Sequence, residues 1–426
     1  MKCKRKVRSI DQKPLYPGLL LVLHASLSAF IVYSCMYGVR KPYTVSSFSG
    51  LYQFGISYKV VLVSAQVFGY MLSKFIGIRF IAQVQSSVRP RYIILLILIG
   101  WLSLFFFAVA PFQYKFLFLF INGLPLGMIW GLVFSYLEGR KWTDLMGSLL
   151  ATSFIVASGF AKTVGGFILQ YTNIDQWWMP FSAASLFLPP LFLFTYFLHK
   201  VPPPTLADIQ TRSLRLPMDK AACLRFIKNY GLLMIAPVCT YVLLTIVRDF
   251  SEDFAVELWK ETNQSSNYLI FSNISFVVGL SVMVIVGLLF LVKNNARAFY
   301  FIHLIILAGF LTCLLGTFLY QERLLSVVNW MVLSTAGFYL GYVTSNSIYY
   351  ERMLATFKIN GNVGFLMYIA DSFGYLGTVV VLLIKELAHY KPNWISFFSG
   401  TFYLVSIIGI ILVILSYQGF RKRLVI

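Results

Sequence analysis

The sequence YSCMYGVR at residues 33–40 recurs in outline as YVLLTIVR at residues 241–248. In each stretch an arginine follows a tyrosine by seven residues, and the two arginines lie 208 residues apart in a chain of 426. A charged side chain at membrane depth costs about 2.5–3.5 kcal/mol, so it usually faces a cavity or a partner. Matching arginines in the two halves therefore predict one anion-binding site to which both halves contribute.

The composition places both stretches in a membrane. The chain is 59% hydrophobic and 17% aromatic, with only 12% charged residues and a mean hydropathy of +0.77. Soluble domains rarely exceed about 50% apolar residues. The apolar runs are about 20 residues long, which fits membrane-spanning helices, and they are continuous rather than alternating, which argues against a β-barrel. We therefore predict an all-α membrane protein.

Twelve apolar stretches predict twelve transmembrane helices. Their expected ranges are 18–41, 57–82, 92–111, 114–138, 145–171, 177–198, 231–252, 266–292, 298–320, 325–350, 361–385 and 394–417. Twelve spans place both chain termini on one side of the membrane. Most basic residues lie in short loops and tails, so the positive-inside rule assigns that side to the cytoplasm. The net charge of +20 fits this rule better than nucleic-acid binding.

The basic leader MKCKRKVR precedes a first helix that we expect to be retained, because no convincing cleavage site follows it. The predicted location is the inner (plasma) membrane of a bacterium, with a monomer as the expected state. The five cysteines and four histidines have no metal-ligand spacing. We expect no metal, no cofactor and no enzyme activity, since no nucleophile or acid–base constellation is recognisable.

The longest polar stretch divides the spans six and six. It predicts an N-terminal six-helix bundle at residues 1–198, a cytoplasmic linker at 199–230 and a C-terminal six-helix bundle at 231–426. Other charged positions repeat with nearly the same offset: Lys162 and Asp371 are 209 residues apart. Such a pattern is typical of transporters built from two parallel repeats, here two pseudo-symmetric bundles.

Arg40 and Arg248 are the best candidates for substrate binding. Guanidinium groups stay protonated and match the oxygens of phosphate or carboxylate with a planar fork. Two of them balance a dianion. The alternative is that each side chain reaches the membrane surface. Lys41 and Asp253 form a second candidate pair, an ion pair that closes the outer mouth and breaks on opening. The alternative there is a solvated surface charge.

Further polar residues lie deep in the predicted spans. Lys162 and Asp371 are mid-span, where they would pair with each other, contact the substrate or bind a coupling proton. Lys74 is similarly deep. Asp249 is a possible proton site that should point away from Arg248, because adjacent residues do not share a helix face.

Tyr33, Tyr37 and Tyr241 lie on or near the arginine faces of their helices. They are candidates to hydrogen-bond the anion, and core packing explains them equally well. Gly123, which opens a strip of glycines at four-residue spacing in GLPLGMIWG, indicates close helix packing rather than a ligand site.

The chain resembles the organophosphate:phosphate antiporters of the major facilitator superfamily, typified by glycerol-3-phosphate and hexose-phosphate transporters. The matching stretches, in order along nearly the whole chain, are YGVRKPY, GYMLSKFIG, GLPLGMIWG, AKTVGGF, VR-x4-D and FGYLG. The resemblance implies that Arg40 and Arg248 clamp a phosphoryl group with Lys74 nearby. It also implies that Lys41 and Asp253 belong to the ion-pair network between the bundles.

Three departures from that family indicate a divergent branch, with a substrate that need not be the same. Lys162 stands where such transporters carry a histidine, and Thr245 stands where an aromatic residue is expected. The loop IRFIAQVQSSVRPR lacks the usual acidic residue.

The predicted function is therefore alternating-access transport of a small organic anion, such as a phosphorylated metabolite exchanged for phosphate. Proton-coupled symport of a sugar or organic anion, with Asp249 or Asp371 titrating, stays open. A transporter-like sensor is the third reading.

Overall fold

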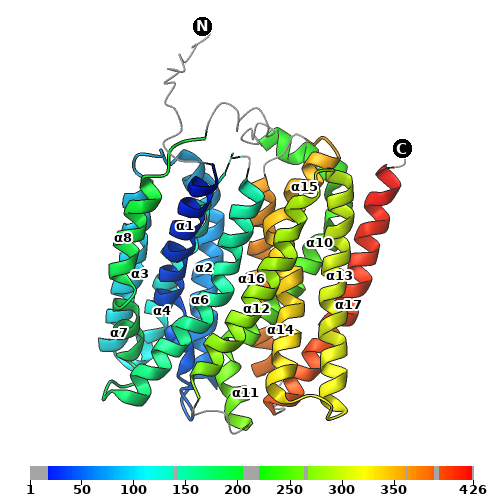
Figure 1. Ribbon diagram of the computed structural model, residues 1–426. Coiled ribbons are helices and arrows are strands. Elements are labelled where there is room, and N and C mark those ends of the chain that lie inside the picture. Colours follow the sequence, from blue (N-terminus) through cyan, green and yellow to red (C-terminus); the bar gives the residue numbers. More distant parts are fainter. Residues whose placement is uncertain are drawn as a thin grey trace.

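The computed structural model describes residues 18–138, 140, 142–204, 220–262, 267–359, 363–387 and 393–424. The predictions for the basic leader at 1–17, for most of the linker and for both chain ends lie outside these ranges. Within them the chain is almost entirely helical, and its helices run roughly side by side (Figure 1).

The helices of the first half are α1 (Gly18–Arg40), α2 (Tyr58–Gln83), α3 (Arg89–Val109), α4 (Lys115–Leu126), α5 (Ile129–Phe134), α6 (Thr143–Tyr171), α7 (Met179–Ser185) and α8 (Leu188–His199). Those of the second half are α10 (Lys220–Asp253), α11 (Ala255–Glu261), α12 (Leu269–Leu288), α13 (Asn295–Gln321), α14 (Val327–Thr344), α15 (Tyr350–Thr356), α16 (Val363–Leu387) and α17 (Trp394–Leu424). The two sets occupy opposite sides of the molecule (Figure 1). They meet where α6 packs on α12 and α2 packs on α16.

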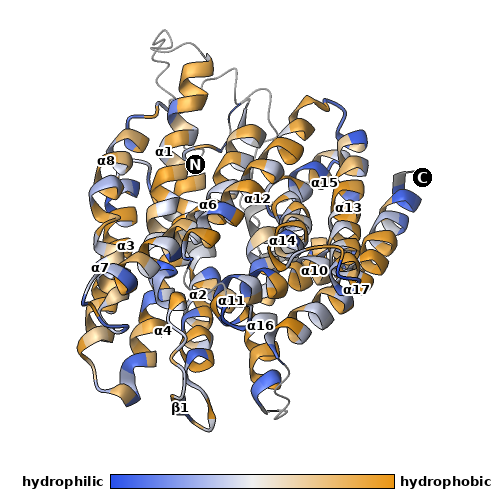
Figure 2. Cartoon of the chain, turned by 60° about the horizontal axis from the view of Figure 1, so that its bottom comes forward, coloured by the Kyte–Doolittle hydropathy of each residue, from blue (hydrophilic) through white to orange (hydrophobic). Residues whose placement is uncertain are grey.

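Every predicted span corresponds to helix in the structure. Among the described residues, eleven helical segments are long and apolar enough to cross a membrane. The remaining predicted span, at 325–350, is α14 followed by a π-helical turn at Ser345–Tyr349 and by α15. Large apolar side chains are exposed on most helices, as expected where lipid is the solvent. Figure 2 shows that hydrophilic residues gather mainly at helix ends and loops.

One predicted boundary needs correction, and two predicted spans contain a break in the helix. α10 begins at Lys220 rather than at residue 231, because 220–230 contains no proline or glycine and continues the helix beyond the apolar stretch. The span predicted at 114–138 is split into α4 and α5, just after Pro125. The span at 177–198 is split into α7 and α8, since prolines at the start of α8 lack the backbone donor that a continuous helix needs.

The two ends of the helix bundle differ. α1 begins and α17 ends at one end, which we call the termini face (Figure 1). The opposite end, the hairpin face, carries α11 and a small antiparallel pair, β1 (Tyr52–Gln53) and β2 (Ile56–Ser57) (Figure 2). Phe54 and Gly55 join these strands with φ of 54° and 76°, as a tight type I′ hairpin turn requires. Neither this hairpin nor α11 is predicted by the hydropathy pattern of the sequence.

The glycine strip of α4 packs against α2, as predicted. A Cβ added at Gly123 would lie 2.2 Å from the backbone oxygen of Gln66, and one added at Gly127 would lie 2.7 Å from the side chain of Ser73. The two backbones therefore approach too closely for any side chain larger than hydrogen.

We expect Gly123→Ala to destabilise the protein by about 1–3 kcal/mol, because the methyl group must push α2 and α4 apart. Gly287→Ala in α12 is the matched control, since nothing lies within 4 Å of its added Cβ. The measurement is thermal unfolding of the purified protein in detergent. An equal melting temperature for the two variants would contradict the close contact.

Candidate functional site

Arg40 is a buried cation without an anion. It is the last residue of α1, and helical side chains lean toward the helix N-terminus, so it points back into the bundle. Its guanidinium carbon lies 3.9 Å from the ring centroid of Tyr70 and 5.8 Å from those of Tyr37 and Tyr375. Its side chain is 1% exposed, and its buried Nε has no hydrogen-bond partner. No carboxylate among the described residues forms an ion pair with it.

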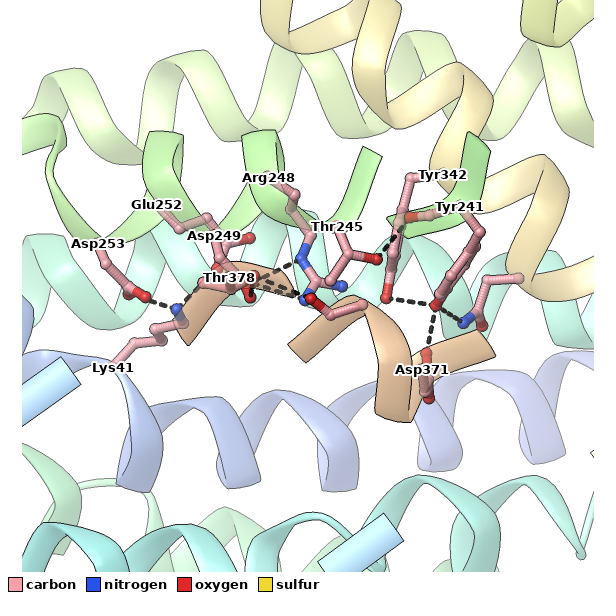
Figure 3. Close-up of polar contacts among 12 residues, drawn as sticks. Lys41, Tyr241, Thr245, Arg248, Asp249, Glu252, Asp253, Tyr342, Asp371 and Thr378 are labelled. Carbon is pink, nitrogen blue, oxygen red and sulfur yellow. Dashed lines mark hydrogen bonds and ion pairs between the residues drawn. The ribbon is translucent and has the colours of Figure 1, made fainter. Parts of the chain in front are cut away.

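Arg248, by contrast, already has a carboxylate partner. Its Nε and Nη2 donate to Oδ1 of Asp249 at 3.0 and 2.6 Å (Figure 3). Thr378 donates to the other carboxylate oxygen at 3.0 Å. The prediction that Asp249 points away from Arg248 is therefore wrong. The two Cβ atoms do diverge around the helix, but the long arginine side chain folds back to reach its neighbour.

Tyr375 lies between the two arginines. The guanidinium carbons of Arg40 and Arg248 are 5.8 and 5.4 Å from the centroid of this one ring. Tyr342 covers Arg248 at 4.3 Å. The arginines of the two halves thus approach the same phenol ring. Tyr375 belongs to the FGYLG stretch and was not predicted as a site residue.

Lys41 bridges the two halves at the hairpin face. Its Nζ lies 2.5 Å from Asp253 Oδ1 and 3.0 Å from Glu252 Oε2, and all three side chains are buried (Figure 3). Tyr339 also donates a hydrogen bond to Glu252. The structure therefore places the predicted pair in contact and adds Glu252, which the sequence analysis missed. The pair is not solvated.

The contacts of Lys41 form a first layer between the two halves, and a second layer of contacts lies beside it. Lys59 of α2 donates to both carboxylate oxygens of Glu257 at 2.7 and 2.9 Å, and to the backbone oxygen of Thr44. Glu386 of α16 accepts from the backbone N–H of Ser57 at 3.1 Å. In both layers the first half supplies the cations and the second half the carboxylates. Both layers therefore join the two halves at the hairpin face.

Asp371 is shared by the two halves nearer the centre. Its Oδ2 lies 2.9 Å from Nζ of Lys74 in α2, and its Oδ1 accepts from the hydroxyl of Tyr241 (Figure 3). Asn346 donates to the same tyrosine hydroxyl at 2.7 Å. The alternative in which Asp371 pairs with Lys162 is wrong, because Asp371 forms its ion pair with Lys74.

Lys162 is buried elsewhere. Its Nζ lies 5.8 Å from the ring centroid of Phe271. It therefore lies where α6 packs on α12. Tyr33 packs edge-on against Tyr37 at 5.6 Å, within the tyrosine-rich surroundings of Arg40.

Two amide side chains fix the end of α1, and the sequence analysis missed both. Gln66 donates to the backbone oxygen of Arg40 at 3.0 Å and to Oδ1 of Asn122 at 2.7 Å. Asn122 in turn donates to the backbone oxygen of Gly100 at 2.8 Å. All the predicted site residues are less than 10% exposed, so neither arginine reaches the surface.

Comparison with known proteins supports the fold. Three solved structures overlay on 94% of this chain. The crystal structure of a D-xylose-proton symporter has a TM-score of 0.62 at 14% identity, with 97% of that chain covered. The nucleoside transporter NupG gives 0.62 at 16% identity and 99% coverage, and the partially occluded inward-open xylose transporter XylE from E. coli gives 0.57 at 13% and 98%.

These likenesses show the all-helical fold of major facilitator superfamily transporters, as predicted. A search of curated proteins gave no match. A model described as a family of unknown function, DUF5690, matches residues 42–423, and nothing in these comparisons supports membership of the organophosphate:phosphate antiporters. The chain belongs to the DUF5690 family and has the major facilitator fold.

Proposed function

We propose that this protein is a secondary transporter that carries a small organic anion across a membrane by alternating access. One observation carries the proposal: Arg40 is buried at the interface of the two halves without a carboxylate partner. The fold it shares with solved sugar and nucleoside transporters supports the mechanism.

The physical argument concerns the cost of an isolated charge. A guanidinium taken from water into an apolar interior loses several kcal/mol of solvation unless an anion or several acceptors replace the water. The tyrosine rings around Arg40 provide only part of that, since a cation–π contact contributes about 0.5–2 kcal/mol. A bound anion would supply the missing partner.

The cross-half contacts suggest how the two halves would move. Opening the hairpin face requires Lys41 to leave Glu252 and Asp253, and Lys59 to leave Glu257. Opening the termini face requires Lys74 to leave Asp371. In this proposal the structure is an occluded state, and anion binding at the centre compensates for the pairs lost on either side.

Uptake of labelled organic anions into proteoliposomes containing the purified protein tests the proposal. The panel holds carboxylates, phosphate esters and neutral sugars, with protein-free liposomes as the control. Each anion is tested with and without phosphate trapped inside, because dependence on internal phosphate would identify the predicted exchange. A panel in which no anion is taken up above the liposome control would refute the proposal.

Proton-coupled symport is the second candidate, and Asp371 is the observation that favours it. Its carboxylate bridges Lys74 of one half and Tyr241 of the other, so a proton on Asp371 would release the contact between the halves.

If this coupling operates, Asp371→Asn should make uptake insensitive to an imposed pH gradient while exchange at equal pH continues. Asp175→Asn, at an exposed position of the hairpin face, is the matched control and should respond as the unmodified protein does. The measurement is initial uptake with an inward pH gradient and without one. A variant that keeps the full response would exclude Asp371 as the proton site.

A further inference from the structure

The charges buried at the interface of the two halves cancel in local groups. Arg248 pairs with Asp249, and Lys74 pairs with Asp371. Lys59 pairs with Glu257. Each of these groups is neutral overall.

The cluster at the hairpin face is neutral as well. Lys41 contacts Glu252 and Asp253, and Lys162 of α6 is a further buried lysine at the interface, with its Nζ 5.8 Å from the ring centroid of Phe271 in α12. These residues contribute two positive and two negative charges. With Arg40 included, these groups hold six basic side chains against five carboxylates among the described residues, so one positive charge is left over, and Arg40 forms no ion pair.

This balance sets the charge of a ligand that fits. A ligand with one negative charge neutralises Arg40 and leaves the interior electrically neutral. A phosphate monoester carries about −1.5 to −2 near neutral pH, so it would bury an excess negative charge. Such an uncompensated charge is expensive in a low-dielectric site. The guanidinium of Arg248 is not free to balance it, since Asp249 occupies its Nε and Nη2.

Two neutral polar atoms near the Lys74–Asp371 pair also lack partners. Oδ1 of Asn346 is buried without a hydrogen bond, although the amide nitrogen of the same side chain donates to Tyr241. The hydroxyl of Tyr368, whose ring lies 5.0 Å from Nζ of Lys74, is buried and unpartnered as well. Buried polar atoms normally have a partner, and hydroxyl groups of a ligand would provide one.

We propose that the substrate is a hydroxylated monocarboxylic acid, with its carboxylate on Arg40 and its hydroxyl groups on Asn346 and Tyr368. The planar fork of Arg40 matches a carboxylate. This inference rests on the proposed transport function and specifies its substrate class. It replaces the symmetric two-arginine clamp on a dianion with recognition by one arginine.

Three ligands of the same carbon number test the charge rule directly: gluconate, glucose and glucose 6-phosphate. Their affinities for the purified full-length protein are measured by calorimetry at about pH 8, where the phosphate ester is a dianion. We expect gluconate to bind at least tenfold more tightly than either of the others. Arg40→Gln should reduce gluconate binding to the level of glucose.

A charge-altering variant provides the sharper test. Asp249→Asn frees Arg248 and raises the uncompensated charge from one to two. The preference should then move at least tenfold toward glucose 6-phosphate. Asp175→Asn removes an exposed carboxylate and should leave the preference unchanged.

The outcomes separate this inference from the proposed function. If glucose 6-phosphate binds the unmodified protein as tightly as gluconate, the monoanion rule is wrong, whereas anion transport through Arg40 stands. If none of the three ligands binds, the substrate class is wrong. Only failure of every anion in the uptake panel would remove the proposed function as well. The affinities of gluconate and glucose 6-phosphate for the unmodified protein test the monoanion rule even if Asp249→Asn does not fold.

Discussion

Replacing Arg40 by glutamine is expected to weaken anion binding and uptake by about 10- to 100-fold. Hydrogen bonds to charged groups contribute about 1.5–3 kcal/mol, and each 1.4 kcal/mol is a factor of ten in affinity. The amide of glutamine keeps part of the volume and the polarity of the side chain, but it removes the charge and the fork. The measurement is initial uptake of whichever anion the panel identifies, together with its binding affinity.

Two further variants separate charge from geometry. Arg40→Lys keeps the charge and loses the bidentate fork, so it should retain intermediate binding. Arg89→Gln is the control, because Arg89 begins α3 and donates to the backbone oxygen of Ser135, away from the interface of the halves. Full uptake of every anion by Arg40→Gln would exclude the guanidinium as the binding group.

Removing the charge of Lys41 is expected to shift the protein toward a state open at the hairpin face. Lys41→Gln leaves Glu252 and Asp253 buried without their shared cation, and breaking one partner of a buried pair typically costs about 3–5 kcal/mol. That cost falls on the closed state alone, since the carboxylates are hydrated once the halves separate. Removing the orphaned charges with Glu252→Gln and Asp253→Asn should reverse part of the shift.

The distance between spin labels at Tyr52 of the first half and Ser396 of the second measures this opening, because both lie at the hairpin face and are exposed. Lys115→Gln is the matched control. Lys115 is also a buried lysine, but it donates to the backbone oxygens of Phe107 and Ala108 within its own half. A distance distribution that is the same in Lys41→Gln and in the unmodified protein would show that the pair does not hold this face closed.

Much of the fold could be predicted because transmembrane helices are specified by local composition. A run of about 20 apolar residues has few stable alternatives in a bilayer, where every backbone group must be satisfied within the segment. The differences between the predicted spans and the observed helices are local as well. α10 begins at Lys220, before the predicted start, and two predicted spans contain a break near prolines. The hairpin and α11 were missed, since short elements between helices have little hydropathy signal.

The site was less predictable, and the partners of its charged residues were missed for one common reason. The sequence indicated that Lys74, Lys162 and Asp371 were buried, but not that Asp371 would choose Lys74. Partner choice depends on how α2, α6 and α16 are rotated and spaced. Hydropathy is nearly insensitive to that rotation when a helix is apolar on most sides.

From the sequence alone came the helical membrane architecture and the burial of both arginines, because each follows from local composition. Only the tertiary structure decided which charges cancel. Arg248 folds back on Asp249, whereas Arg40 lies among tyrosine rings without a carboxylate. The two arginines occupy matching places in the sequence but have different surroundings in space, and a charge in a low-dielectric interior depends on its immediate neighbours.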